Sequence, residues 1–379
     1  MRGGPSCSHQ PRGRAMRSVV VGGGIAGCAI AAALRGTPLS RESVILEGGQ
    51  PGARPDAGIL LSPAGLRALG SIAPEFDWRG AGRVVDTVSL RSRAGRVFFE
   101  RPFEACVAIS QRDFTAMLRE AARTAGFLGG WTMGGLELEP DGNIRAVRLA
   151  DGGSLRGDAF FACDGARSRA RETMFPQCAL GPAVVEEIVT VVDAPEIASE
   201  LSSSLRRYHD ENGGLAIEIV ATSSLRVAFT LQFDPSRWRL GSDAPAALCA
   251  FLGETVADWA PEVLSLIARI DFGRCQRHQA REISPPAALA RGNLVLVGDA
   301  AHGALPFTGR GTNDALIDAA LLGNLLATAR SSEDVRESFA RYSELREPQR
   351  RRTLQEDVAL RSAFLEPIGP GGPRLPVVA

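Results

Sequence analysis

A short run of β-branched residues, Val19-Val20-Val21, leads directly into the glycine-rich segment Gly22-Gly23-Gly24-Ile25-Ala26-Gly27. The run predicts a buried parallel strand, and the small residues that follow through Ala33 predict a helix packed closely against it. In the pattern GxGxxG, Gly22 allows the tight turn, Gly24 lets the backbone approach a pyrophosphate, and Gly27 lets the helix contact the strand. The first helical N–H groups, those of Gly24, Ile25 and Ala26, then face the phosphates. This segment therefore predicts a Rossmann-like α/β domain that binds a nucleotide.

A carboxylate stands at the expected distance after the glycines. A second strand, 43–46, ends at Glu47, where an acidic side chain can hold a ribose hydroxyl. A strand, a glycine turn, a helix and an acidic residue in this order are more specific than a lone GxGxxG. They do not separate NAD from FAD.

Composition limits the remaining possibilities. The chain has 379 residues, 45% of them hydrophobic and 23% charged, which is typical of one large or two ordinary folded domains. The 43 basic and 43 acidic residues cancel, so general binding to nucleic acid is not expected. Every basic residue is an arginine, which excludes Schiff-base lysine chemistry, P-loop NTPases and ordinary kinases.

Cysteine and histidine usage gives no metal signature. The seven cysteines form no CxxC pair, and the four histidines lie far apart, so we expect no metal and a reduced, cytoplasmic protein. The apolar stretch 18–34 is explained by the glycine motif, and no other stretch predicts a membrane span. Residues 1–16 lack the apolar centre of a secretory signal and are expected to be a disordered extension. Residues 367–379 are expected to form a flexible tail.

The pattern of apolar residues changes in the middle of the chain. A strand at 159–163 ends in Asp164-Gly165, and alternating apolar residues from about 181 to 285 then predict an antiparallel sheet. The chain returns to a buried strand at 294–297, followed by Gly298-Asp299 and a long helix over 312–329. Two further helices are expected after this one. Ser331 or Ser332 could cap the first of them, and Pro348 would separate it from the second. We therefore predict a discontinuous nucleotide-binding domain, 17–180 and 286–366 with the C-terminal helices, and an inserted, mostly antiparallel β-sheet domain, 181–285.

Three motifs in this order resemble one family. The glycine motif at Gly22, then Asp164-Gly165, then Gly298-Asp299 resemble the single-component FAD-dependent aromatic hydroxylases of the para-hydroxybenzoate hydroxylase type. The resemblance covers about residues 17–367, and GDAAHGALPFTGRGTNDALIDAA is its most specific part. Arg310 stands where the family often has glutamine, and Ile317 where it often has glutamate. Neither departure removes a backbone contact.

The resemblance implies roles for particular residues. The Asp299 carboxylate would accept a hydrogen bond from a ribityl hydroxyl of FAD. The N–H groups at a helix start would face the pyrimidine edge of the flavin, where reduction places negative charge. Asp164 would lie near the pyrophosphate and the transient nicotinamide site, Arg112 near the pyrophosphate or the isoalloxazine, and Pro306 beside the flavin ring. The residues implied in FAD binding are Gly22, Gly24, Ile25, Ala26, Gly27, Glu47, Arg112, Asp164, Asp299, Pro306, Gly311, Thr312 and Asn313, with Arg167 and Arg171 as further anion-binding candidates.

The resemblance also implies an activity. NADPH or NADH would bind briefly and reduce FAD, and O2 would then form a flavin C4a-hydroperoxide that transfers an oxygen atom to an electron-rich ring. The substrate would be a small aromatic or polyketide-like molecule, as in a tailoring step of secondary metabolism. Monomer and homodimer both remain open.

The inserted sheet would cover the substrate. Arg206, Tyr208 and His209 are the candidates for orienting or deprotonating it, with Pro306 on the flavin side. A solvated strand edge is the more common role for such residues. The aromatic residues Phe229, Phe233 and Trp238 and the His302 imidazole are expected to be structural, and His278 to lie at the surface.

Several alternatives stay open. The same scaffold supports Baeyer–Villiger oxidation, epoxidation, and reduction without oxygen as in geranylgeranyl-reductase-like enzymes. A flavin halogenase is disfavoured, because the chain has no lysine and no W-x-W-x-I-P stretch. A non-catalytic scaffold like the GDP-dissociation inhibitors shares the fold, but the intact glycine motif, Glu47 and Asp299 favour retained flavin.

Overall fold

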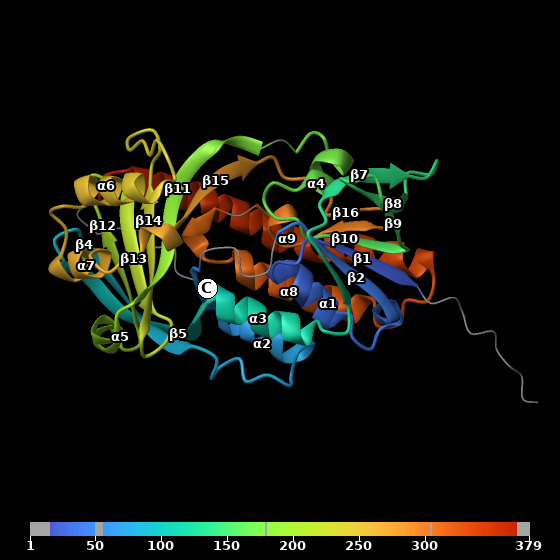
Figure 1. Cartoon of the computed structure of the whole chain (residues 1–379), viewed down its shortest axis with the longest axis horizontal. Helices are drawn as coiled ribbons and strands as arrows, with labels where there is room; N and C mark the ends of the chain where they lie inside the picture. Colours follow the sequence, from blue (N-terminus) through green and yellow to red (C-terminus); the bar gives the residue numbers. More distant parts are fainter. Residues whose placement is uncertain (1–15, 50–55, 179, 304, 370–379) are drawn as a thin grey trace, which may run out of the picture.

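The computed structural model describes residues 16–49, 56–178, 180–303 and 305–369. The expectations for residues 1–15 and 370–379 lie outside the described residues. The described chain forms two lobes, one around β1, β2 and β10 and one around β12 to β14 (Figure 1). This is the predicted mixed α/β architecture, and each lobe is built on one large sheet.

The first lobe is built on a six-stranded sheet. Its order is β16-β17-β10-β1-β2-β6, and all neighbours are parallel except β16 and β17. Val19 and Val20 are fully buried, as the β-branched run predicts. The strands are β1 (Arg17–Val21), β2 (Glu42–Glu47), β6 (Gly126–Gly129), β10 (Ala159–Ala162), β16 (Ala290–Arg291) and β17 (Leu294–Leu296).

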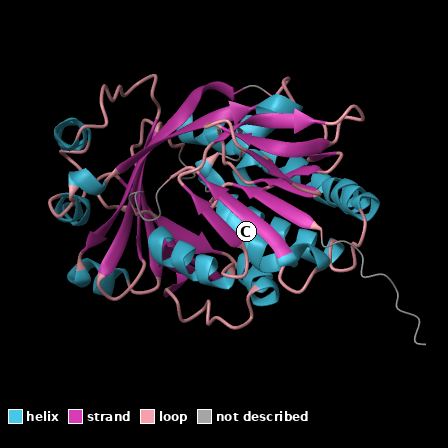
Figure 2. Ribbon diagram, turned by 45° about the vertical axis from the view of Figure 1, so that its right-hand side comes forward, coloured by secondary structure: helices cyan, strands magenta, loops and turns pink. Residues whose placement is uncertain are grey.

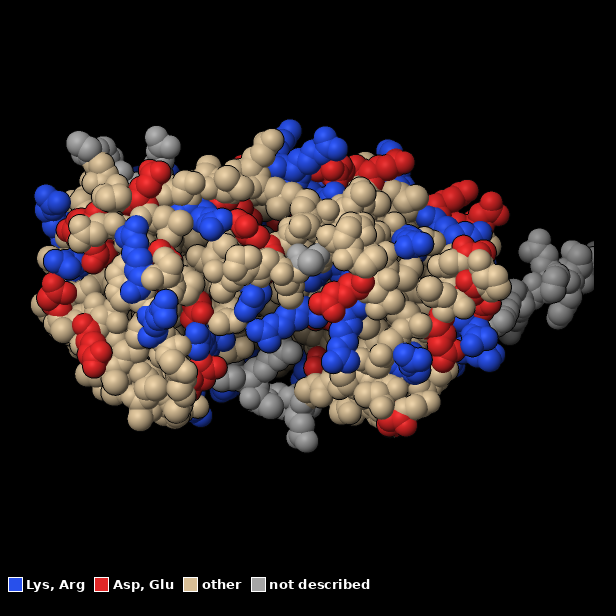
Figure 3. Space-filling view, turned by 90° about the horizontal axis from the view of Figure 1, so that it is seen from above, with Lys and Arg blue, Asp and Glu red and all other residues tan. Residues whose placement is uncertain are grey.

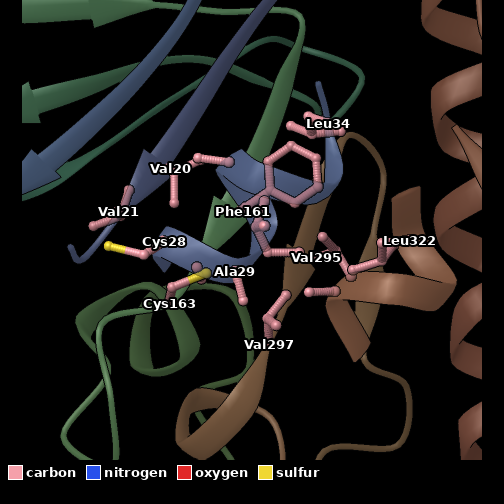
Figure 4. Close-up of a cluster of buried hydrophobic side chains, with 14 of the residues drawn as sticks. Val20, Val21, Cys28, Ala29, Leu34, Phe161, Cys163, Val295, Val297 and Leu322 are labelled. Atoms are coloured by element: carbon pink, nitrogen blue, oxygen red, sulfur yellow. The ribbon is translucent and has the colours of Figure 1, made fainter. Parts of the chain in front are cut away.

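Helices cover this sheet, and the side chains between the helices and the sheet form the core of the first lobe. Val20, Val21, Phe161, Val295 and Val297 of the sheet pack with Cys28 and Ala29 of the first helix (Figure 4). Small residues allow α1 and α8 to approach closely, because a Cβ on Gly323 would lie 2.9 Å from the Ala33 carbonyl oxygen. The helices of this lobe are α1 (Ile25–Ala33), α2 (Pro63–Ile72), α3 (Gln111–Ala121), α4 (Arg169–Met174) and α8 (Gly311–Leu325).

The second lobe is an eight-stranded sheet of order β15-β11-β14-β13-β12-β4-β5-β3. Its strands are β3 (Gly58–Leu61), β4 (Arg83–Ser92), β5 (Val97–Ser110), β11 (Leu180–Asp193), β12 (Ser204–His209), β13 (Leu215–Ala221), β14 (Arg226–Phe233) and β15 (Gln276–Ile283). The predicted boundary near 181 matches the start of β11. However, three strands come from 58–110, which we expected to belong wholly to the nucleotide-binding domain. The parallel pairing of β4 with β12 brings them into this sheet.

The two faces of this sheet have different partners. The outer face carries Tyr208, Ile217, Phe229 and Phe233 and packs under α5 (Pro195–Leu201), α6 (Pro245–Thr255) and α7 (Pro261–Ile267). These helices lie on the side away from the first lobe (Figure 2). The inner face therefore looks toward the first lobe.

Shorter elements complete the chain. An antiparallel sheet of β7 (Met133–Leu138), β8 (Ile144–Leu149) and β9 (Ser154–Arg156) flanks the first lobe. The short 3-10 helices are η1 (Pro38–Arg41), η2 (Phe272–Arg274), η3 (Gly298–Ala300) and η4 (Pro306–Thr308). Both η3 and η4 follow β17 and precede α8, within the segment that the sequence marked as most specific.

The last helix differs from the prediction. We expected a break at Pro348, whereas α9 (Ser332–Leu365) runs through it. Its start is capped by Ser331 and Asp334, as predicted. A proline removes one intrahelical N–H donor, but buried residues on both sides of it, including Tyr342, Arg346 and Arg350, fix the helix to the protein.

Charge is distributed without a dominant sign on the face seen in Figure 3, where arginines and carboxylates are interspersed. In the part of the chain that the structure describes, no helix has both the length and the apolarity needed to cross a membrane. Within the same residues, no group of three or more His, Cys, Asp or Glu side chains is placed to hold a metal.

Candidate functional site

A cavity of about 920 Å³ opens at the carboxyl ends of the parallel strands. This is where open α/β sheets bind their ligands, and the volume is in the upper part of the range for cofactor sites. Most of the predicted cofactor residues line it: Gly22, Gly24, Ile25, Ala26, Glu47, Arg112, Asp164, Asp299, Gly311 and Thr312.

The glycine turn is shaped as the motif predicts. Gly22 has φ of +104°, and a Cβ there would lie 2.2 Å from the Cys163 carbonyl oxygen. A Cβ on Gly27 would lie 1.8 Å from the Gly22 carbonyl oxygen, so this glycine serves packing and does not line the cavity. A Cβ on Gly24 would meet no protein atom within 4 Å. The space beside Gly24 at the start of α1 is therefore open to a phosphate.

Glu47 is held at the end of β2 by the backbone. Its Oε2 accepts a hydrogen bond from Gly23 N at 2.9 Å, and its Oε1 accepts one from Gly49 N at 2.8 Å. These bonds fix the carboxylate beside the glycine turn and keep a lone pair on each oxygen available. Contact with a ribose hydroxyl stays a prediction for this position.

Two aspartates face the cavity from other strands. Asp164 follows β10; its Oδ2 accepts from Ala170 N at 3.2 Å, whereas its buried Oδ1 has no hydrogen-bond partner among the described residues. Asp299 lies in η3 after β17, crowded by protein atoms but open toward the cavity. Burial raises the pKa of the Asp164 carboxyl. An unpaired buried oxygen is costly, so the site fits a ligand that donates a hydrogen bond to Asp164.

The start of α8 completes this side. Gly311 and Thr312 line the cavity, and no side chain caps the helix. Asn313 instead turns away: its Oδ1 accepts from Ser62 N at 2.8 Å and its Nδ2 donates to Leu60 O at 3.0 Å. The structure therefore makes Asn313 a link from α8 to β3 and α2 through its side chain.

Pro306 is placed outside this cavity. It begins η4 and is half-buried, and its neighbours Leu305 and Phe307 belong to a buried cluster with Val185 and Ala216 of the second lobe. The predicted loop thus lies where the two lobes meet.

The arginines divide into two groups. Arg112, Arg167 and the unpredicted Arg119 and Arg169 line the cavity. Arg171 points elsewhere: it is fully buried and donates to the carbonyl oxygens of Ala166 and Ala300, the latter at 3.1 Å. Its guanidinium anchors the start of α4 to η3 and is not available to an anion.

Arg119 is the clearest residue that the sequence reasoning missed. It lies seven residues after Arg112 on α3, two helical turns along the same face, which is the signal that could have found it. Its guanidinium carbon is 5.2 Å from the centre of the Phe127 ring, and its Nε has no hydrogen-bond partner among the described residues. Trp131, Thr132 and Met133 also line the cavity, and no motif marks them.

The structure does not bring the three substrate candidates of β12 to this cavity. Arg206 and Tyr208 both bond to Glu262 of α7 on the outer face. Burial and the neighbouring Glu262 carboxylate raise the pKa of the Tyr208 hydroxyl. Because side chains alternate along a strand, the choice of 206 and 208 selected the face opposite the first lobe. His209 does lie on the inner face, buried beside Arg207.

The other histidines and aromatic residues are structural where the structure shows their contacts. His302 Nε2 lies 2.8 Å from Asp318 Oδ2, which also accepts from Gly298 N at 3.2 Å. Phe229 and Phe233 belong to the outer-face core, and Trp238 packs against it. His278 is half-buried on β15 and not at the surface as expected.

Comparisons with known proteins identify relatives of this chain. Residues 72–357 match the family model described as "FAD binding domain". A 3-amino-4-hydroxybenzoate 2-monooxygenase of Streptomyces platensis is 26% identical, with 96% of this chain and 91% of that protein covered. An FAD-dependent urate hydroxylase of Klebsiella pneumoniae is 30% identical over 54% of this chain and 51% of that protein.

Solved structures show the same fold. The Klebsiella pneumoniae protein HpxO, in complex with FAD and uric acid, superposes with a TM-score of 0.75 at 23% identity and covers 92% of this chain and 87% of its own. Pseudomonas aeruginosa PqsL superposes with a TM-score of 0.76 at 21% identity and covers 92% of this chain and 96% of its own.

Proposed function

The chain belongs to the family of class A FAD-dependent aromatic monooxygenases, and we propose that it uses NADPH or NADH and O2 to hydroxylate a small aromatic or polyketide-like molecule. The observation that carries this proposal is the convergence of the glycine turn, Glu47, Asp164 and Asp299 on one large cavity. The relatives named for aminohydroxybenzoate and urate oxidation act on small rings, which supports a ring substrate here. We extend the proposal to a cytoplasmic tailoring step of secondary metabolism.

The residues of the cavity fit FAD in a defined arrangement. The open start of α1 would face the pyrophosphate, and Glu47 would accept from a ribose hydroxyl. Asp299 would accept from a ribityl hydroxyl, and the unpaired Asp164 Oδ1 has its acceptor capacity free for the cofactor. Arg112 and Arg119 on α3 would balance the phosphate charge.

The start of α8 would serve the reduced state. Its N-terminal N–H groups and the helix dipole favour negative charge next to Gly311 and Thr312. When bound, FAD accepts a hydride from NAD(P)H and supplies the electrons that activate O2. One oxygen atom enters the substrate as a hydroxyl group, and the other leaves as water with the electrons of NAD(P)H and a proton.

An absorption spectrum of the protein as purified, followed by NADPH in air, tests the proposal. We expect flavin bands at about 370 and 450 nm that bleach on reduction and return with O2. A panel of phenols and amino-phenols should then accelerate NADPH oxidation, and the product should gain one oxygen atom by mass.

Other outcomes point to other functions. Substrate reduction without oxygen gain would indicate a reductase, and an ester or epoxide product would indicate one of the other oxidations of this scaffold. A colourless protein that takes up no added FAD would overturn the proposal and favour a partner-binding scaffold.

A further inference from the structure

A row of polar side chains lies on the inner face of the eight-stranded sheet, between an apolar contact with η4 of the first lobe and an apolar contact with β3, the edge strand of the same sheet. At one end, Val185 and Ala216 share a buried cluster with Leu305 and Phe307 around η4. At the other end, Ala228 lies under β3, since a Cβ on Gly58 would be 2.4 Å from the Ala228 Cβ. Side chains alternate along a strand, so the residues between these contacts face the first lobe.

The centre of this row is the buried Arg207. Its Nη1 donates to Glu218 Oε2 at 3.2 Å, its Nε donates to His209 Nε2 at 3.2 Å, and its Nη2 donates to Gln232 Oε1. The arginine charge is therefore paired with a carboxylate, and its donors are directed at protein acceptors. An anionic substrate finds no uncommitted cation in this network.

Glu187 ends the network on β11. Its Oε1 accepts from Gln232 Nε2 at 2.7 Å, and the residue is half-buried. Gln232 thus holds Glu187 at a fixed position relative to Arg207. The carboxylates of Glu187 and Glu218 give this face hydrogen-bond acceptors, which suit a ligand that donates hydrogen bonds.

We propose that Glu187 accepts a proton from an O–H or N–H substituent of an aromatic ring bound against this face, so that the enzyme selects rings carrying such a donor. The inference rests on the proposed function. The O–H or N–H bond breaks, its electron pair stays on the ring heteroatom and activates the ring toward oxygenation, and the proton moves to the Glu187 carboxylate and then to solvent. Arg207 and Gln232 are positioning residues.

The surroundings of Glu187 support this role. Burial raises its pKa to about 7; the Gln232 hydrogen bond lowers it, the Glu218 carboxylate raises it and Arg207 lowers it. His278 on β15 and His209 on β12 also lie on this face, as does Arg101 of β5 by the strand register, and burial holds the pKa of His209 well below its usual value. From the first lobe, Leu305 and Phe307 pack in a cluster with Val185, two residues before Glu187 on β11. Asp357 of α9 accepts a hydrogen bond from Leu305 N. A base near pH 7 is matched to proton transfer from a weakly acidic ring substituent.

The experiment compares the FAD-loaded wild type with E187Q and the control E186Q. Glu186 is the neighbouring residue on the opposite face, where it accepts from Arg277 Nε at 2.7 Å. The probes are 2-aminophenol and catechol, each with its fully O- and N-methylated counterpart. The readouts are perturbation of the flavin spectrum and probe-stimulated NADPH oxidation between pH 5.5 and 8.5, with FAD content and melting temperature as folding checks.

We expect 2-aminophenol and catechol, but not their methylated counterparts, to stimulate NADPH oxidation by the wild type. The stimulated rate should rise as the pH increases through about 7. E187Q should lose about 100-fold in stimulated rate together with this pH dependence, E187D should recover part of both, and E186Q should remain within about twofold of the wild type.

Equal stimulation by methylated probes, an unchanged rate and pH profile in E187Q, or a panel that never perturbs the flavin spectrum would each overturn the inference. These results differ from failure of the proposed function, in which the protein carries no flavin or does not reduce it with NADPH.

Discussion

Gly27 of α1 packs against Gly22 of the preceding turn so closely that a Cβ on Gly27 would lie 1.8 Å from the Gly22 carbonyl oxygen. Gly24, between them, has open space where its Cβ would be. The three glycines of the motif therefore have different structural roles. Gly27 allows close packing, Gly22 allows the turn, and Gly24 leaves room for the ligand.

This difference predicts opposite outcomes for two alanine variants. G27A must push α1 away from β1 and should lower the free energy of unfolding by about 3 kcal/mol. G24A should fold with an unchanged melting temperature in the absence of FAD but bind FAD about tenfold more weakly. Thermal unfolding of the apoprotein and FAD titration check both, and a folded, stable G27A would contradict the close packing.

Arg119 should contribute to FAD affinity although no motif includes it. R119M keeps most of the side-chain length but removes the charge from the cavity wall, so we expect FAD binding to weaken by about five- to tenfold, mostly at low salt. R123M is the matched control, because Arg123 is exposed and lies just beyond α3 with Glu120 as its partner. Equal FAD affinity of the two variants would remove Arg119 from the site.

Asp318 should make the fold sensitive to acid. Burial alone would raise its pKa, but His302 and Arg346 outweigh burial and lower the pKa to about 2. The depressed pKa stabilises the folded state by about 2 kcal/mol above pH 4, and this contribution is lost as the pH falls from about 4 to 2.

The variant D318N tests this prediction. It removes the charged partner that Arg346 Nε contacts at 2.6 Å and leaves Asp314 as the one carboxylate paired with this buried arginine among the described residues, so the free energy of unfolding should fall by about 3 kcal/mol at pH 7. The exposed Asp243 gives the control D243N, expected within about 0.5 kcal/mol of the wild type. Urea unfolding at pH 7 and pH 3 measures both, and an unchanged acid transition in D318N would contradict the role of this carboxyl.

Tyr208 should affect stability and not turnover. Its hydroxyl bonds Glu262 on the outer face, behind the sheet as seen from the cavity. Y208F should therefore cost about 1 kcal/mol of stability and keep the KM of the ring substrate. A raised KM with unchanged stability would return Tyr208 to the substrate site.

The glycine motif and Glu47 could be predicted from local spacing, and Asp164 and Asp299 from the resemblance to the family. A turn of that shape needs glycine at Gly22, and parallel strands that end together bring their following residues to one edge of the sheet. The order of these motifs was enough to predict the FAD-binding architecture.

The sequence could not decide what depends on long-range pairing. Whether Tyr208 or Arg207 faces the first lobe depends on which face of β12 the helices α5 to α7 cover, and strand alternation alone leaves both faces equivalent. The joining of 58–110 to the inserted sheet, the passage of α9 through Pro348 and the placement of Glu187 opposite Gln232 likewise follow from tertiary contacts. The sequence therefore determined the cofactor end of the site, where the chemistry is local, and the tertiary structure decided the proposed substrate end, where residues from four strands meet.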